Sequence, residues 1–405
     1  MSLHTLFARR SFLASSRTSA FVPLAVMAAA LVPACSSSMN GGDDDGGDGL
    51  FDCSASGTDS DPRCNTSTAG TVGTGPKFTG GLSTAVHHGF VADNKLVLAV
   101  EFTAVDDTYG GIFTVDLATG DRALVSGKYK DPVNGDVSRG TSPTGVSLNQ
   151  VRDVALGPDG KWYALASQSL QSDRLIVAID PATGNQQVVF NDGLVTCTGI
   201  SSGPVEFDPD SGITVGSDGS IYVVLNNLPV SSGKGIAKVA SDGSCSMVTL
   251  SGAQTTADNH GTGPDVIGSF LYNVTFHNNA LALLQFNTHS SIITIDPATG
   301  NRTMVSVSPD KGTGPELATD SMAIAANGTY WTYNGERNGV FGLTSVDAAT
   351  GNRTSYEAKA GPAKKEQGDD RGIWVHPDGK HILLQYANAI LIYDPTTGNS
   401  NTLSY

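Results

Sequence analysis

Residues Ile292–Ser306 read Ile-Ile-Thr-Ile-Asp-Pro-Ala-Thr-Gly-Asn-Arg-Thr-Met-Val-Ser, and this stretch decides the fold. A β-branched run reaches Asp296, the chain turns through Pro297–Gly300, and a second β-rich run follows. Such a pattern predicts a β-hairpin. Close copies stand at Asp116–Gly120, Asp180–Gly184, Asp347–Gly351 and Asp394–Gly398, with a shortened copy at Asp242-Gly243. A hairpin that recurs along one chain indicates a repeat architecture.

Each hairpin is preceded by two further strand signals joined by a tight turn. In the last copy Ile373-Trp-Val375 leads through His-Pro-Asp-Gly to a second apolar run, His381–Gln385. Proline presets φ and glycine accepts the left-handed conformation, so this turn connects antiparallel strands. Equivalent turns stand at Asp93-Asn94, Pro158–Gly160, Asp218-Gly219, Asn278-Asn279 and Asn327-Gly328. Each repeat is therefore a unit of four antiparallel strands.

Six such units cover residues 83–405, with the turn aspartates from Asp116 to Asp394 about 56 residues apart on average. Four-stranded units of this size form the blades of a propeller, which protects its sheet edges by radial arrangement. The sequence thus predicts an all-β, six-bladed β-propeller. The ring can close by packing of the first blade against the last, or residues 73–80 can add a strand.

The alternation of a Gly-Ile-x-Val-x-Pro-Asp-Gly pattern, as in Gly372–Gly379, with Ile-Asp-Pro-Ala-Thr-Gly-Asn-Arg-Thr resembles the NHL-type and gluconolactonase-like six-bladed propellers. The resemblance covers all six repeats. It implies a metal-dependent hydrolase or lactonase as one function, with a single Ca²⁺ or Zn²⁺ at the channel mouth. Those enzymes have a Glu early in the first blade, where this chain has His87-His88.

Composition restricts the partners of the protein. The chain has 405 residues, 48 of them Gly, only 16% charged residues, and a net charge of −15. Removal of residues 1–35, which hold three Arg and no acid, leaves −18. So acidic a chain lacks the basic patch that nucleic-acid phosphates require, and anionic lipid does not attract it. We expect a monomer that binds no nucleic acid.

The N-terminal region 1–35 has the form of an export signal. Arg9-Arg10-Ser-Phe-Leu13 resembles a twin-arginine motif, and an apolar run from Ala20 to Val32 follows. Val32-Pro-Ala-Cys35 resembles a bacterial lipobox, in which Cys35 is acylated. Cleavage near Ala34 by an ordinary signal peptidase and a membrane anchor helix are the alternatives. The serine after Cys35 favours the outer membrane, so the domain is expected to be lipid-anchored in the cell envelope.

Residues 36–72 are rich in Ser, Gly, Asp and Thr, which predicts a disordered tether between the anchor and the propeller domain, 73–405. Once Cys35 carries lipid, four cysteines remain, an even number that suggests disulfides in an exported protein. Cys53 and Cys64 would close a small loop in the tether. Cys197 and Cys245 would pair within the domain.

Alignment of the repeats on their turns places one set of residues at the entrance of the inner strands. The ring positions are His87, Asp153, Gly212, Asn273, Ser321 and Gly372, and polar neighbours add His88, Arg152, Asp320, Asp370 and Arg371. Carboxylate, imidazole and amide groups converging there would bind a ligand. Asp153, Asn273 and Asp320 could also hold Ca²⁺ or Zn²⁺, although no cofactor is firmly implied. Pairing of these groups in a water-filled channel is the simpler interpretation.

A third motif, Gly-Thr-Gly-Pro, occurs at 73–76, 261–264 and 312–315, each time between an outer strand and the next inner strand. We expect these connections to converge near one channel mouth. Two hypotheses for function follow. The first is a non-catalytic binding or scaffold module for a protein or carbohydrate partner in the cell envelope. The second is a metal-dependent hydrolase or lactonase with its site at the channel mouth.

Overall fold

The computed structural model describes residues 73–76, 83–103, 108–131, 135–143, 148, 150–167, 174–191, 197–199, 207, 212–225, 234–251, 261–264, 270–286, 289–317, 321–333, 336–337, 340–364, 372–386 and 389–404. These all belong to one compact unit, Gly47–Tyr405; the other unit, Met1–Gly46, lies outside the described residues. The export signal, Cys35, the tether and the pair Cys53 and Cys64 lie outside them too. In the described ranges no helix is long and apolar enough to cross a membrane.

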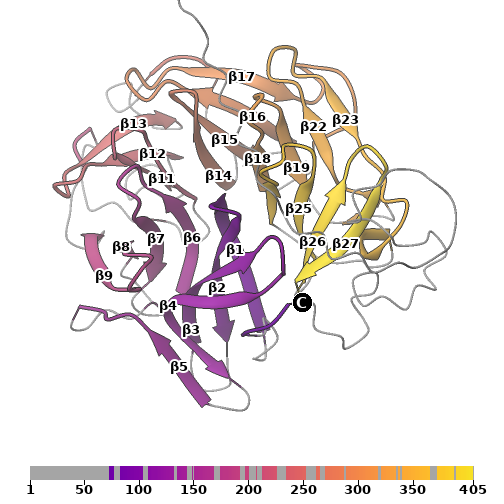
Figure 1. The fold of residues 1–405 in the computed structure, drawn as a ribbon. Helices are drawn as coiled ribbons and strands as arrows, with labels where there is room; N and C mark the ends of the chain where they lie inside the picture. The colour runs from indigo at the N-terminus through magenta and orange to yellow at the C-terminus, as the bar shows by residue number, and fades with distance from the viewer. Residues whose placement is uncertain are drawn as a thin grey trace, which may run out of the picture. The chain divides into compact units, whose positions relative to one another are not determined.

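Six antiparallel sheets follow one another along the chain, one for each predicted repeat (Figure 1). Blade 1 consists of β1 (Ser83–Ala92), β2 (Lys95–Thr103), β3 (Thr108–Asp116), β4 (Arg122–Asp131) and β5 (Gly135–Arg139). Blade 2 consists of β6 (Gln150–Leu156), β7 (Trp162–Ser167), β8 (Arg174–Ile179) and β9 (Gln186–Asn191). Blade 3 consists of β10 (Ile213–Val215), β11 (Ile221–Leu225), β12 (Lys234–Val239) and β13 (Cys245–Ser251).

The second half of the chain repeats this order. Blade 4 consists of β14 (Phe270–His277), β15 (Ala280–Phe286), β16 (Ser290–Ile295) and β17 (Arg302–Val307). Blade 5 consists of β18 (Ser321–Ile324), β19 (Tyr330–Tyr333), β22 (Thr344–Val346) and β23 (Arg353–Ser355), and β20 (Glu336–Arg337) and β21 (Val340–Phe341) form a separate hairpin. After the 3-10 turn η3 (Pro362–Lys364), blade 6 consists of β24 (Ile373–Val375), β25 (Ile382–Tyr386), β26 (Ala389–Asp394) and β27 (Asn399–Ser404). The predicted six-bladed propeller is therefore confirmed.

The tight turns follow the local chemistry of the sequence. Asp93 and Asn94 have φ of 50° and 56°, and Asn278 and Asn279 have φ of 49° and 60°. Two consecutive left-handed residues make the two-residue hairpin turn that matches the twist of antiparallel strands, and Asn and Asp tolerate that conformation. The strand β5 and the hairpin β20–β21 were not predicted, because neither carries a repeat motif.

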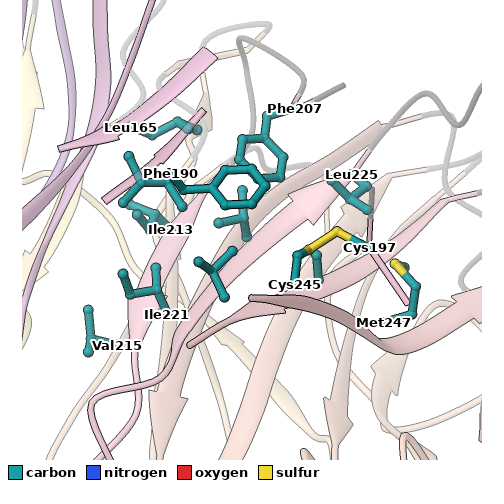
Figure 2. Close-up of a cluster of buried hydrophobic side chains, with 14 of the residues drawn as sticks. Leu165, Phe190, Cys197, Phe207, Ile213, Val215, Ile221, Leu225, Cys245 and Met247 are labelled. Atoms are coloured by element: carbon teal, nitrogen blue, oxygen red, sulfur yellow. A yellow bond between two sulfur atoms is a disulfide. The ribbon is translucent and has the colours of Figure 1, made fainter. Parts of the chain in front are cut away.

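The core lies between the blades. Each of six buried clusters combines side chains of two neighbouring blades, including Leu98 of blade 1 with Leu383 of blade 6. Figure 2 shows the cluster of blades 2 and 3, where Phe190 and Phe207 pack with ring centroids 5.1 Å apart. A middle strand such as β8, buried from Leu175 to Ile179, packs a neighbouring blade on each face. This explains why its sequence is apolar without alternation.

The ring closes between blade 6 and blade 1. Each inner strand contacts the inner strand of the next blade, and β24 contacts β1. The indole Nε1 of Trp374 donates to Gly89 O at 3.1 Å across this interface. All four strands of blade 6 come from the C-terminal segment, and the described residues 73–76 form a loop against blade 1 rather than a strand. Of the two modes of closure, the described residues show direct packing of blade on blade.

The Gly-Thr-Gly-Pro motif packs on the outer hairpin of the blade that follows it. In blade 4, Thr262 N and Oγ1 donate to Asn301 Oδ1, Arg302 N donates to Thr262 O, and Arg302 Nε donates to Pro264 O. Gly261 has φ of +78°, and a Cβ there would lie 2.0 Å from Gly300 O, so only glycine fits. The same loop–hairpin contact occurs at Thr74, Asp121 and Arg122 and at Thr313, Asn352 and Arg353. The expectation that these three copies converge at the channel mouth is wrong, because the outer hairpin binds them at the rim.

The arginine of this contact also reaches the preceding blade. Nη1 of Arg302 donates to Thr249 Oγ1 of β13, Nη1 of Arg353 to Ser306 Oγ of β17, and Nη1 of Arg122 to Ser404 Oγ of β27. All three arginines are buried. In blade 2 the amide of Gln186 takes this place and donates to Ser126 Oγ at 2.9 Å. The final arginine of the Thr-Gly-Asn-Arg pattern therefore joins blades, a role that the turn chemistry did not predict.

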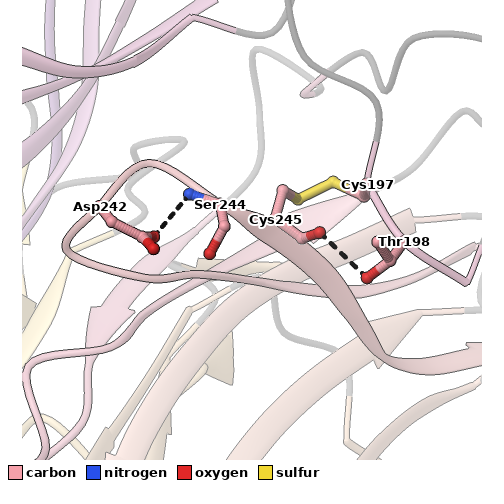
Figure 3. Close-up of a disulfide and its surroundings, with 5 residues drawn as sticks. All are labelled: Cys197, Thr198, Asp242, Ser244 and Cys245. Carbon is pink, nitrogen blue, oxygen red and sulfur yellow. Dashed lines mark hydrogen bonds between the residues drawn. A yellow bond between two sulfur atoms is a disulfide. The ribbon is translucent and has the colours of Figure 1, made fainter.

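In blade 3 a disulfide stands where blades 1, 4 and 5 have this arginine. Cys245 is the first residue of the outer strand β13, as Arg302 is of β17, and it is bonded to Cys197. Thr198 N donates to Cys245 O, and Met247 N donates to Thr198 O, so the connecting segment also pairs with the outer strand. Figure 3 shows the disulfide and a further hydrogen bond, which Thr198 Oγ1 donates to Cys245 O. The predicted pairing of Cys197 with Cys245 is confirmed. A covalent bond thus secures the connection between blades 2 and 3.

Candidate functional site

The six inner strands surround a central channel with a cavity of about 330 Å³. Its lining changes along the strands. Where the strands begin, His88, Asp153 and Asn273 contribute polar atoms, and where they end, residues such as Val215 and Val375 are apolar. The channel therefore has one polar end, which is the predicted channel mouth.

Three β-bulges lie at this polar end, in β1 between Val86 and Gly89, in β6 between Val151 and Asp153, and in β14 between Leu271 and Asn273. A bulge inserts one extra residue and changes the direction in which the next side chains point. His87, His88, Asp153 and Asn273 all lie within or next to these irregularities. Local backbone structure thus explains why polar residues of apolar strands face the channel.

Glu101, Arg152 and His87 form a charged group at the channel mouth, which we call the mouth triad. Glu101 Oε2 lies 3.4 Å from Arg152 Nη1 and 3.5 Å from His87 Nε2, and the last two atoms are 3.4 Å apart. Burial opposes the ionisation of Glu101, but the His87 hydrogen bond and the Arg152 charge outweigh it and lower the pKa of this carboxyl group. Glu101 is thus an anion held beside a cation.

The mouth triad is not saturated by its own contacts. Glu101 Oε2 and Arg152 Nε are buried and lack a hydrogen bond of good geometry within the described residues. A buried polar atom without such a bond costs about 1–3 kcal/mol. Both atoms are closed off from solvent, so a ligand could supply the missing bonds only if the side chains of the mouth triad rearrange.

His88 and Asn273 meet across the channel, from blade 1 to blade 4. Asn273 Nδ2 donates to His88 Nδ1 at 3.2 Å, and Asn273 Oδ1 accepts from Thr275 Oγ1 at 3.1 Å. Blades 1 and 4 stand opposite each other in a ring of six. This pair narrows the polar end of the channel.

Asp153 connects blades 2 and 3. Its Oδ1 accepts from Val154 N at 2.7 Å and its Oδ2 accepts from Ile213 N of β10 at 2.8 Å. Only 4% of the residue is exposed. Burial raises the pKa of Asp153 to about 8, although the two backbone N–H groups act in the opposite direction. Both oxygens are therefore engaged by the backbone.

Five predicted site residues, His87, His88, Arg152, Asp153 and Asn273, come together at the polar end of the channel. Asp320, Asp370 and Arg371 lie outside the described residues. Glu101 was missed, because the alignment followed only the inner strands and Glu101 stands in β2 opposite Ala85. A charged residue inside the apolar run Leu96–Phe102 was the signal that could have identified it.

Comparisons with known proteins find distant likenesses among solved structures. No family model matches this chain, and no curated protein matches it. Among solved structures, a protein of unknown function from Bacteroides thetaiotaomicron is 12% identical, with 82% of this chain and 74% of that chain covered and a TM-score of 0.47. A gluconolactonase from Xanthomonas campestris is 11% identical, with 80% and 88% covered and a TM-score of 0.47. A PQQ-bound aldose sugar dehydrogenase from Streptomyces coelicolor is 16% identical, with 79% and 91% covered and a TM-score of 0.43. The chain is a six-bladed β-propeller with gluconolactonase-like structures among its neighbours, and identities this low say nothing about its activity.

Proposed function

We propose that this protein is a non-catalytic binding module of the cell envelope that holds a carbohydrate partner at the polar end of its propeller channel. The acylated Cys35 would anchor the chain, and the segment 36–72 would let the propeller reach its partner. The mouth triad and the pair His88–Asn273 would form the binding surface.

The engagement of Asp153 is the observation that carries this proposal. A metal ion binds the ionised form of a carboxyl group. Burial raises the pKa of Asp153 to about 8, and each of its oxygens accepts a backbone N–H group, one of which holds two blades together. A hydrolase built on Asp153, Asn273 and Asp320 would have to remove the proton from this carboxyl group before the ion could bind. A polar binding surface requires no such change.

The chemistry of the mouth favours a hydroxyl-rich ligand. Glu101 accepts hydrogen bonds, Arg152 donates them, and the imidazoles and the Asn273 amide do both. The charges of Glu101 and Arg152 balance, so neither an anion nor a cation is preferred. A sugar hydroxyl both donates and accepts, and it fits such a mixed set better than a carboxylate, phosphate or ammonium group does.

The test is binding of the full mature chain, in detergent micelles, to an array of bacterial surface polysaccharide fragments. We expect Glu101→Gln and Asn273→Ala each to weaken binding of the captured glycan at least ~10-fold, since each removes a hydrogen bond at a buried site. Glu357→Gln is the matched control, because Glu357 is exposed and belongs to a segment that contacts the outer hairpin of blade 6.

Two results would overturn the proposal. In the first, no glycan shows binding that depends on Glu101 and Asn273, and a protein is cross-linked to the channel mouth instead. The other is a bound divalent ion that Asn273→Ala removes, together with hydrolysis of a lactone or ester. That second result would establish the metal-dependent hydrolase.

A further inference from the structure

The turn between β24 and β25 holds three side chains whose ligand atoms converge. They are His376, Asp378 and His381, and one ligand atom from each lies within 4.8 Å of the other two. Within the described residues this is the one such group of three His, Cys, Asp or Glu side chains. Because β24 runs from the polar end of the channel, this turn lies at its opposite end.

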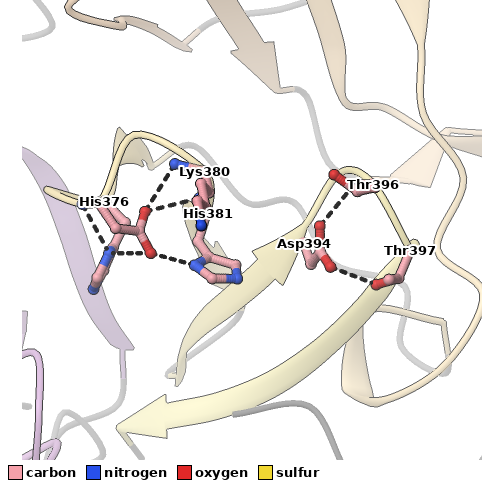
Figure 4. Close-up of polar contacts among 7 residues, drawn as sticks. His376, Lys380, His381, Asp394, Thr396 and Thr397 are labelled. Atoms are coloured by element: carbon pink, nitrogen blue, oxygen red, sulfur yellow. Dashed lines mark hydrogen bonds and ion pairs between the residues drawn. The ribbon is translucent and has the colours of Figure 1, made fainter. Parts of the chain in front are cut away.

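One carboxylate oxygen faces both imidazoles. Asp378 Oδ2 lies 3.1 Å from His376 Nδ1 and in close contact with His381 Nδ1 (Figure 4). Asp378 Oδ1 accepts the backbone N–H groups of Lys380 at 2.8 Å and His381 at 3.0 Å. The backbone thus fixes the carboxylate and directs Oδ2 between the two rings.

His376 Nδ1 faces the same carboxylate. It lies 3.1 Å from Asp378 Oδ2 and 3.3 Å from the backbone N–H of Asp378. An imidazole nitrogen has one lone pair, so a metal ion bound at Nδ1 would take the place of that N–H.

The donor set selects the metal. Two imidazole nitrogens and one carboxylate oxygen suit Zn²⁺, whose bonds of about 2.0–2.2 Å place tetrahedral ligands roughly 3.3 Å apart. Ca²⁺ and Mg²⁺ require mainly oxygen ligands and are disfavoured. The side chain of His381 is 6% exposed and that of His376 15%, whereas that of Asp378 is 32% exposed, so one side is open to water. The carboxylate of Asp394 also interacts electrostatically with His381 and adds negative charge to the region.

We propose that His376, Asp378 and His381 bind one Zn²⁺ ion, with a water molecule as the fourth ligand. The ion replaces the contact between Asp378 and His381 and connects the end of the inner strand β24 to the start of β25. This site is separate from the mouth triad and does not depend on the proposed carbohydrate binding.

The experiment is calorimetric titration of the chelator-treated full chain with Zn²⁺. We expect one ion per chain, and a Co²⁺-substituted protein with the visible absorption of tetrahedral coordination. His376→Gln and Asp378→Asn should each weaken Zn²⁺ binding by about 10- to 100-fold or more. His277→Gln is the matched control, because His277 precedes the corresponding turn in blade 4, where Asn278 and Asn279 offer no carboxylate.

Circular dichroism of the variants shows whether unfolding causes a loss of Zn²⁺ binding. His376 and Asp378 both lie in the turn region outside the buried core, so these two substitutions are expected to leave the spectrum unchanged. The proposal is overturned if no stoichiometric Zn²⁺ binds, or if His376→Gln and Asp378→Asn bind it as tightly as the His277→Gln control does. If Asn273→Ala abolishes Zn²⁺ binding instead, the ion belongs to the channel mouth.

Discussion

Arg122 Nη1 donates to Ser404 Oγ at 2.7 Å, and these two residues stand 282 positions apart in the chain. Ser404 Oγ in turn donates to Gly120 O at 2.8 Å. The contact joins β4 of blade 1 to β27 of blade 6, an interface that no connecting segment crosses within the described residues. In the part of the chain that the structure describes, noncovalent contacts hold the ring closed there.

We predict that Arg122→Ala opens this interface. The substitution removes buried hydrogen bonds of a charged group, which stabilise by about 1.5–3 kcal/mol each, to Ser404 Oγ and Pro76 O. Hydrogen exchange should become faster throughout β24–β27. The matched control is Arg302→Ala, which loses the same contacts between blades 3 and 4, where the chain itself connects the two blades. Equal exchange in blade 6 for both variants would contradict the special role of Arg122.

The disulfide should contribute strongly to stability. Cys197 and Cys245 are 48 positions apart, and closure of such a loop restricts the unfolded chain by about 4 kcal/mol in the chain-entropy model. The double variant Cys197→Ser/Cys245→Ser should therefore unfold at a clearly lower urea concentration. Reductant should lower the midpoint of the wild-type chain to a similar extent and leave that of the double variant unchanged. A wild-type midpoint insensitive to reductant would disprove the prediction.

Asp153 should make stability depend on pH. Burial raises the pKa of this carboxyl group to about 8 in the folded protein, whereas the unfolded chain releases the proton near 3.8, the ordinary pKa of Asp. Between these values the folded state binds more protons, so the free energy of unfolding falls as the pH rises, by up to about 1.4 kcal/mol per pH unit.

Urea unfolding at pH 5, 6.5 and 8 measures this dependence. Asp153→Asn cannot ionise, so the difference in stability between wild type and variant should shrink or change sign as the pH rises. The other titrating groups are the same in both proteins, so their contributions cancel in the difference in stability. A constant difference over this range would show that Asp153 is ionised in the folded state.

Anchoring through Cys35 is tested by detergent phase partition of the expressed chain. Acylation adds apolar surface worth about 0.8 kcal/mol per buried CH₂ group, enough to carry an acidic domain into the detergent phase. Cys35→Ser should move the chain to the aqueous phase and abolish incorporation of labelled palmitate. Cys53→Ser is the control, and this variant should stay in the detergent phase and incorporate labelled palmitate. Labelling that persists in Cys35→Ser would refute the lipobox assignment.

The local repeats determined the strands and turns of this protein before any tertiary structure was considered. Asn278-Asn279 and the Asp-x-x-Thr-Gly turns fold through contacts of residues two to four positions apart, as the bonds of Asp296 Oδ1 to Ala298 N and Oδ2 to Thr299 Oγ1 show. Such interactions depend only on neighbouring residue types. Six copies of one unit were therefore enough to predict the architecture.

The contacts between blades were decided by the tertiary structure. Arg302 and Arg122 occupy the same place in the repeat, but only closure of the ring brings Arg122 to Ser404. Likewise His88 meets Asn273 because blades 1 and 4 face each other, and Glu101 joins His87 and Arg152 because bulges in β1 and β6 redirect their side chains. These distances depend on the number of blades and on one-residue irregularities, which the periodicity of a sequence does not contain. The hairpin at Ile292–Ser306 thus specifies a blade, and the ring of blades specifies the site.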